Sequence, residues 1–231
     1  MSTSITSGVN ANIEKVRVFT GPNVGVYLVA TEEFVLAPGG IKPSVLKAIN
    51  LTLDVPVHTV YANTNLFGAL TLANKHGIVL STVIDDNSFE VFENLGLGKV
   101  SRVPKNFYAL GNCARTNDER TILSPFIDEN SRKIIKETLK TDITVMKLGG
   151  SVLLGSLVGA NLNGAVVSEL IAEDEFENIR NHLGVNKVDY STVNKGFLMP
   201  STGFIANSKG VVVGEDTTGL EIMKIMNILF D

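Results

Sequence analysis

The sequence predicts an α/β fold in which five copies of one small unit close into a ring. Three observations lead to this prediction. A short hairpin motif recurs at almost constant spacing. An amphipathic helix follows each copy, and an extended segment follows the helix in the first four copies. The last copy lacks this extended segment, while the chain begins with an extended segment that belongs to no copy. Self-similarity at a fixed period is typical of proteins built from one repeated supersecondary unit.

The repeated motif consists of an apolar segment, a turn and a second apolar segment. It reads GALTLANKHGIVLS at 68–81, GSLVGANLNGAVVS at 155–168 and STGFIANSKGVVVG at 201–214, with weaker copies at 111–123 and 25–37. The aligned turn positions lie 43, 43, 44 and 46 residues apart: Thr31, Asn74, Asn117, Asn161 and Asn207. Six residues before each turn stands a small residue, where we expect the first strand to begin: Gly25, Gly68, Gly111, Gly155 and Ser201.

The turn has a local explanation in the preferences of its residues. Asn favours the first position of a type I turn, and a left-handed Gly at the fourth position makes a bulged hairpin. Phe34 and Arg120 stand where this Gly is expected in the first and third copies. Because positive φ is costly for bulky residues, we expect these two hairpins to use a different turn.

Each hairpin leads into a helix and a closing strand. In the fourth copy Phe176, Ile179 and Leu183 have the i, i+3, i+7 spacing of a helix that lies on a core. The last helix opens with a Thr218–Glu221 capping box, and the chain ends soon after it. The predicted ring domain spans 13–231 after a flexible tail at 1–12, and its repeats are about 23–65, 66–108, 109–152, 153–197, and 198–231 completed by 13–22.

Composition excludes several classes of function. The net charge is −4 and the Lys and Arg residues are not clustered, so we expect little direct contact with RNA. No apolar run reaches the roughly 18 residues of a membrane span, so no membrane association is expected. The segment GSVLLGS at 150–156 lacks the Lys of a phosphate-binding loop, and the pairs Asp85–Asp86 and Asp118–Glu119 fit a helix start and a turn. We therefore expect no cofactor and no metal.

Cys113 is the single cysteine and the one candidate nucleophile. A base and an orienting group would have to lie beside it. His58 falls in a neighbouring closing strand and is not excluded by the sequence, whereas a small buried thiol in an apolar strand is the usual case. The apolar helix at the C-terminus is open to two readings as well, a buried helix or one that docks a partner.

Several motifs together resemble the translation initiation factor 6 family, the ribosome anti-association factor of archaea and eukaryotes, over residues 13–230. They are ALGNCARTNDERTILSPFID (109–128), GSLVGANLNGAVVS (155–168), STVNKGF (191–197) and GFIANSKGVVVGEDTTGLEIMKI (203–225). The size resembles the archaeal branch. The resemblance implies the pentein fold, a five-fold pseudosymmetric α/β-propeller that the N-terminal strand closes.

The resemblance also implies a function and a partner. It implies a cytoplasmic, monomeric, non-enzymatic factor that binds the large ribosomal subunit, chiefly through a ribosomal protein near the sarcin-ricin loop, and blocks the small subunit. A role in large-subunit maturation is implied too. The alternative is a guanidine-modifying hydrolase or transferase of the same fold, which carries a late Cys, a His and carboxylates at the ring centre. The only Cys here is at 113, which disfavours that alternative.

We expect the partner to bind the end of the ring where each closing strand leads into the next copy. Asn112, in Leu-Gly-Asn, is carried over by motif to the ribosome-facing end of the family. The expected partner-binding residues are Asn65, Ala69, Gly111, Asn112, Gly155, Ser156, Asn194, Ser201 and Thr202.

Overall fold

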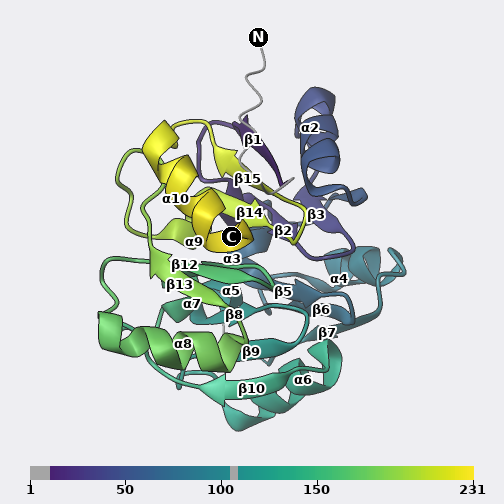
Figure 1. The fold of residues 1–231 in the computed structure, drawn as a ribbon. Coiled ribbons are helices and arrows are strands. Elements are labelled where there is room, and N and C mark those ends of the chain that lie inside the picture. The colour runs from purple at the N-terminus through teal and green to yellow at the C-terminus, as the bar shows by residue number, and fades with distance from the viewer. Residues whose placement is uncertain (1–10, 105–108) are drawn as a thin grey trace.

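The computed structural model describes residues 11–104 and 109–231, and these form five three-stranded sheets surrounded by helices (Figure 1). Most of the expected tail at 1–12 therefore lies outside the described residues, and strand β1 already begins at Asn12. Each sheet joins an antiparallel hairpin to a parallel third strand. The predicted fold of five repeats is confirmed.

The elements follow one order in every unit. The hairpins are β2 (Val29–Ala30) with β3 (Val35–Pro38), β5 (Thr71–Asn74) with β6 (Gly77–Leu80), β8 (Ala114–Thr116) with β9 (Arg120–Leu123), β11 (Val158–Ala160) with β12 (Gly164–Val167), and β14 (Phe204–Ala206) with β15 (Gly210–Gly214). The third strands are β4 (Val57–Val60), β7 (Lys99–Arg102), β10 (Asp142–Val145), β13 (Lys187–Tyr190) and β1 (Asn12–Val16). The long helices are α2 (Pro43–Leu53), α4 (Asp86–Glu93), α6 (Glu129–Leu139), α8 (Phe176–Leu183, after a 3₁₀ turn at Glu173–Glu175) and α10 (Gly219–Phe230).

The N-terminal strand closes the ring, as the sequence predicts. In Figure 1 the purple β1 lies beside the yellow β15, and the two strands pair in parallel with Asn12 opposite Gly210. Val16 and Val18 are buried in one apolar cluster with Val212 of β15. The last sheet is therefore made from both ends of the chain, and no unit is left incomplete.

The first strand of each unit does not begin at the small residue. A one-turn helix stands there instead, in all five units: α1 (Val24–Tyr27), α3 (Phe67–Leu70), α5 (Leu110–Cys113), α7 (Leu154–Leu157) and α9 (Pro200–Gly203). A short apolar run does not distinguish a strand from a buried helical turn by periodicity, which explains the wrong prediction.

The small residues let these five helical turns pack in a circle. A Cβ atom on Gly68 would lie 1.9 Å from the carbonyl oxygen of Gly25, and one on Gly111 would lie 2.0 Å from that of Gly68. Gly155 approaches the carbonyl of Gly111 in the same way, and the Ser201 hydroxyl donates to the Gly155 carbonyl over 2.7 Å. Each turn thus contacts the next one around the axis, and larger residues do not fit.

The hairpin turn also differs from the prediction. Gly77, Gly164 and Gly210 do not have positive φ, so the turn contains no left-handed glycine bulge. Their role is close approach, because a Cβ on Gly164 would lie 1.9 Å from the carbonyl oxygen of Ile228 in α10.

The two hairpins without this glycine make the same turn as the others. The Thr31 amide donates to Phe34 over 2.9 Å and the Asn117 amide to Arg120 over 3.0 Å, as the Asn161 amide does to Gly164 over 3.1 Å. The expectation that Phe34 and Arg120 mark a different turn is therefore wrong, although neither residue has positive φ.

In four of the five units the recurring Asn fastens the hairpin to the helix of the following unit. Its side-chain oxygen accepts backbone N–H groups of its own turn, as Asn161 does from Asn163 and Gly164. Its amide donates to the last turn of the next long helix, with Asn74 reaching Leu139, Asn117 reaching Leu183, Asn161 reaching Leu229 and Asn207 reaching Leu53 over 2.8–3.1 Å. Because a helix end leaves carbonyl groups unpaired, this amide caps the helix.

The helices bury the faces that their periodicity predicts. Ile179 and Leu183 of α8 are buried, and the capping box of Thr218 and Glu221 opens α10. Helix α10 also buries Ile228 against its sheet, while Leu220 is 76% exposed, so the helix is buried on one side only. Within the described part of the chain no helix is long and apolar enough to span a membrane.

Candidate functional site

The ring has two ends that differ in construction. We call one the tip end; it carries the five hairpin turns and the last turns of the long helices. We call the other the junction end; it carries the first turns of the long helices and the loops that lead from a third strand to the next helical turn. Its described loops are 17–23, 61–66, 146–153 and 191–199, and residues 105–108 of the remaining loop lie outside the described residues.

The nine expected partner-binding residues belong to the junction side. Seven lie in the circle of helical turns: Ala69 in α3, Gly111 and Asn112 in α5, Gly155 and Ser156 in α7, and Ser201 and Thr202 in α9. Asn65 and Asn194 lie in the loops that precede α3 and α9. The structure therefore brings the seven together around the axis and holds the other two beside them.

Burial separates these residues into two groups. Gly111, Gly155, Ser156 and Ser201 are buried, with Ser156 only 4% exposed, so their positions are explained by packing between helical turns. The rest are exposed or half-buried, namely Asn65, Ala69, Asn112, Asn194 and Thr202. Only this second group offers side-chain surface to a partner.

Asn194 has a structural role in ring closure. Its amide donates to the carbonyl of Pro22 and to Oδ1 of Asn23, both over 3.2 Å, and its Oδ1 accepts the Thr217 hydroxyl over 3.0 Å. By the predicted repeats Asn194 belongs to the fourth unit, so these bonds join that unit to the fifth, through Thr217 and Pro22, and to the start of the first, through Asn23. Asn194 also adopts a left-handed conformation with φ of 50°, which Asn tolerates better than most residues.

The Thr-Val-Asn-x-Gly loop that contains Asn194 is anchored by one carboxylate. Glu221 of α10 accepts the amides of Lys195 and Gly196 and the hydroxyl of Thr192, in addition to its capping-box bonds with Thr218. Burial raises the pKa of Glu221, but the hydrogen bonds from Thr218, Gly196 and Thr192 outweigh it and lower the pKa to about 2. The loop conformation therefore depends on an ionised Glu221.

Exposed apolar side chains gather at the junction end, and sequence reasoning missed this feature. In the described residues fourteen large apolar side chains are exposed, and ten of them lie in the junction loops, the strand–helix loops beside them or the first two turns of α10. They are Phe19, Tyr61, Leu66, Phe126, Leu153, Leu170, Phe197, Leu198, Leu220 and Met223. Exposed apolar side chains concentrated at one end of a protein make that end a candidate interaction surface.

The same end is rich in carboxylates because the long helices begin there. Asp85 and Asp128 cap α4 and α6 by accepting the amides of Ser88 and Ser131, and hydrogen bonds from these serines lower the pKa of each carboxyl. The acidic turn at Glu173–Glu175 stands at the start of α8. The junction end thus joins apolar side chains to negative charge.

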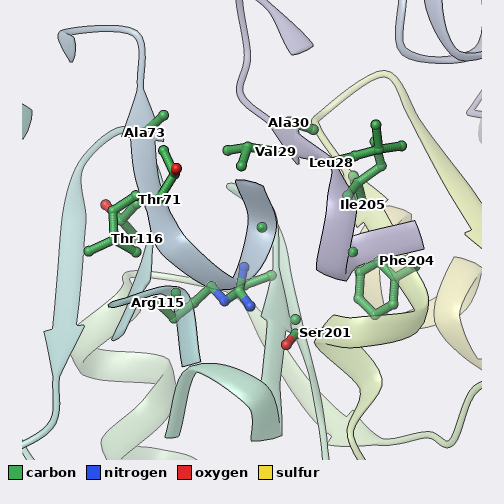
Figure 2. A pocket seen from close by; sticks show the side chains of 17 residues that line it. Leu28, Val29, Ala30, Thr71, Ala73, Arg115, Thr116, Ser201, Phe204 and Ile205 are labelled. Carbon is green, nitrogen blue, oxygen red and sulfur yellow. The ribbon is translucent and has the colours of Figure 1, made fainter. Parts of the chain in front are cut away.

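The ring centre holds a small cavity and no recognisable catalytic arrangement in the described residues. The cavity has a volume of about 60 Å³ and is lined by the helical turns and the first hairpin strands, including Arg115 and Thr71 (Figure 2). Cys113 ends the helical turn α5 rather than lying in a strand, and burial raises the pKa of its thiol. Residues 11–104 and 109–231 contain no group of three His, Cys, Asp or Glu side chains suited to a metal ion.

Known proteins resemble this chain over nearly its whole length. The family model described as the eIF-6 family matches residues 13–228. Translation initiation factor 6 of Staphylothermus marinus is 32% identical over 221 residues, covering 92% of this chain and 95% of the relative. The factor of the same name from Methanobrevibacter smithii is 32% identical over 218 residues, covering 94% and 97%.

Two further proteins are similar to this chain. Translation initiation factor 6 of Pyrobaculum aerophilum is 26% identical over 219 residues, covering 94% of this chain and 99% of the relative. Among solved structures, the N-terminal domain of ArgZ, an arginine dihydrolase from the ornithine-ammonia cycle in cyanobacteria, aligns with a TM-score of 0.49 and 13% identity, over 78% of this chain and 73% of that one. The family match and the 32% identity of two relatives confirm the resemblance seen in the motifs, and the chain belongs to the eIF-6 family.

Proposed function

We propose that this chain binds the large ribosomal subunit and thereby prevents the small subunit from joining it. The relatives named translation initiation factor 6 support a role in translation initiation. The observation that carries the proposal is the concentration of exposed apolar side chains at the junction end, with ten of the fourteen in the described residues.

Steric exclusion requires a rigid body, and the ring supplies one. Its hairpins are bonded to the helices of neighbouring units through Asn74, Asn117, Asn161 and Asn207. A rigid surface loses little conformational entropy on binding, so more of the contact energy remains as affinity. The factor then acts by occupying a surface of the large subunit and needs no chemical step.

The chemistry of the junction end favours a protein as the main contact. Its apolar side chains suit the core of a protein interface, and its carboxylates suit the basic surface of a ribosomal protein. Carboxylates repel RNA phosphates, which agrees with little direct RNA contact. We propose a ribosomal protein near the sarcin-ricin loop as the partner, a monomeric factor in the cytoplasm, and a second role in large-subunit maturation.

The alternative of a guanidine-modifying enzyme is less well supported. A nucleophilic cysteine needs a lowered thiol pKa, whereas burial raises the pKa of Cys113. The guanidinium of the protein's own Arg115 extends into the ring centre, where the catalytic residues of such an enzyme would lie. We propose that the chain is not an enzyme; arginine hydrolysis that Cys113→Ser abolishes would overturn this view.

Sedimentation of purified ribosomal subunits in sucrose gradients tests the proposed function. We expect the wild-type protein to travel with the large subunit only and to reduce the peak of joined ribosomes. Asn112→Arg places a bulky cation on half-buried α5 and should weaken this binding without changing the circular dichroism spectrum. Equal sedimentation of the variant and the wild type would argue against a contact at α5. If the wild-type protein bound neither subunit, the proposed function would be contradicted.

A further inference from the structure

Arg115 departs from the five-fold pattern of the ring centre. It occupies the position two residues before the turn, where the other four units have apolar residues or glycine: Val29, Leu72, Gly159 and Ile205. All five positions line the central cavity of about 60 Å³. Figure 2 shows the guanidinium of Arg115 extending from its strand toward the middle of this cavity.

The positive charge of Arg115 has no counter-charge in the protein. Its Nη2 donates to the carbonyl of Gly155 over 2.7 Å, while its buried Nε has no hydrogen-bond partner. Within 11–104 and 109–231 no carboxylate forms an ion pair with it, and residues 1–10 and 105–108 contain no Asp or Glu. Burial lowers the pKa of Arg115 to about 10, so the guanidinium remains charged at neutral pH.

Thr71 is a second departure in the same cavity. It stands three residues before its turn, where the other units have apolar residues: Leu28, Ala114, Val158 and Phe204. Thr71 is only 2% exposed, and its hydroxyl has no hydrogen-bond partner in the described protein. A threonine hydroxyl donates one hydrogen bond, so the cavity wall contains two unused donors, on Thr71 and on Arg115.

The charge of Arg115, which has no ion-pair partner in the described residues, calls for an acceptor with negative charge. Buried charges in proteins are paired, and buried donors are hydrogen-bonded, because leaving either without a partner is costly. We propose that the central cavity binds one small monovalent inorganic anion, such as chloride or bromide, held by the Arg115 guanidinium. A single cation balances a single negative charge, which disfavours phosphate.

The tip side of the cavity does not supply this charge. A smaller hollow of about 20 Å³ shares lining residues such as Ala30 and Ala73 with the cavity and is also lined by Glu32 and Asp118. The Glu32 carboxylate accepts the amide of Ser208, and Asp118 accepts the amide of Lys75. Because both acids lie beside the cavity and repel an entering anion, anion exchange is expected to be slow, and samples need long equilibration.

Thermal unfolding in exchanged anions tests the proposal. The wild-type protein is equilibrated in sodium bromide or in sodium gluconate, whose anion is too large for the cavity, at constant ionic strength. A ligand that binds only the folded state at ten times its Kd should raise the unfolding midpoint by about 3–6 °C. Arg115→Met should abolish this increase and, in gluconate, unfold at a midpoint no lower than that of the wild type, because it removes a half-buried charge that has no ion-pair partner.

Two controls make the result specific to the cavity. Arg120→Met removes an exposed arginine of the same sheet, whose Nη1 donates to Asn181, and should keep the bromide effect. Anomalous scattering from wild-type crystals grown in bromide should show the ion in contact with the Arg115 guanidinium, independently of any variant. Equal bromide responses in wild type and Arg115→Met, or only water at that position in the crystals, would overturn the proposal.

Discussion

The tip end and the junction end are built from the same five units, but the units resemble one another at the tip end and differ at the junction end. At the tip end the units agree, and the turn residues Asn74, Asn161 and Asn207 are at most 3% exposed and bonded to helix ends. At the junction end the units differ, and side chains such as Tyr61 and Leu220 are each 76% exposed. Residues that repeat in every unit therefore serve the fold. The surface on which the units differ is the candidate binding surface.

Ring closure is the condition on which both ends depend, and removing it should have the largest effect. Deleting residues 1–20 removes β1 and the buried Val16 and Val18, and burial of two valines alone contributes about 3–6 kcal/mol. We expect the deletion to replace the single sharp thermal transition by a broad one at lower temperature. Deleting residues 1–10 keeps β1 and serves as the control; a sharp, unshifted melt of the longer deletion would contradict closure by β1.

A pH titration should destabilise the junction end without affecting the tip end. The pKa of Glu221 is about 2 in the folded protein, below its usual value near 4.5. A lowered pKa stabilises the fold above the unfolded-state pKa, and this stability is lost as the pH falls from about 4.5 toward 2. We expect Glu221→Gln to cost about 2–3 kcal/mol at pH 7 and to flatten the pH dependence of urea unfolding in that window.

The contacts of Glu221 allow the effect to be located. The lost bonds involve Lys195 and Gly196, so amide hydrogen exchange should increase in the 191–197 loop of the variant. Exchange at the hairpin turn of Asn74 should stay as in the wild type, since this turn is bonded to α6 in a distant unit. Equal increases in both places would mean that the two ends are not independent.

A glycine substitution tests the packing of the tip end. A Cβ on Gly164 would lie 1.9 Å from the carbonyl oxygen of Ile228, so Gly164→Ala must displace the end of α10. Overpacking of this kind costs about 1–3 kcal/mol, measured as a lower midpoint in urea unfolding. Gly219→Ala is the matched control, because nothing lies within 4 Å of its Cβ position, and it should be close to neutral. An unaffected Gly164→Ala would show that the hairpin is loosely packed.

The sequence predicted those parts of the fold that the repeat itself encodes. Constant spacing gave five units, and the missing last strand gave closure by the N-terminal one. It did not predict the circle of helical turns, because Gly25, Gly68 and their equivalents approach backbone atoms of other units. For the same reason the role of Gly164 was misread, since its neighbour Ile228 lies in a helix far along the chain.

The candidate site was predictable only in outline. Alignment identified the end of the ring where the units differ, and it found Asn112 and Asn65 there. It also selected Gly155 and Ser201, which the structure buries between helical turns. The exposed apolar side chains were missed because an apolar residue in a loop has no periodicity that tells exposure from burial. Placing loop residues such as Tyr61 and Phe197 on the predicted ring would have shown that they lie at the junction end.

Two leucines at opposite ends of the ring offer the sharpest test of which end binds. Leu220 in the first turn of α10 is 76% exposed, and Leu51 in the last turn of α2 is 64% exposed. We expect Leu220→Arg to weaken binding to the large subunit about tenfold, equivalent to about 1.4 kcal/mol, because it puts a cation against a basic partner. Leu51→Arg should bind as the wild type does.

The pair is matched in chemistry, so a difference between the variants reports position. Both changes replace an exposed leucine on a helix surface, where substitutions alter stability by about 0.5 kcal/mol or less. Thermal melts of the two variants should therefore coincide with that of the wild type within a few degrees. If Leu51→Arg weakens binding and Leu220→Arg does not, the tip end is the binding surface, and the exposed apolar side chains at the junction end need another explanation.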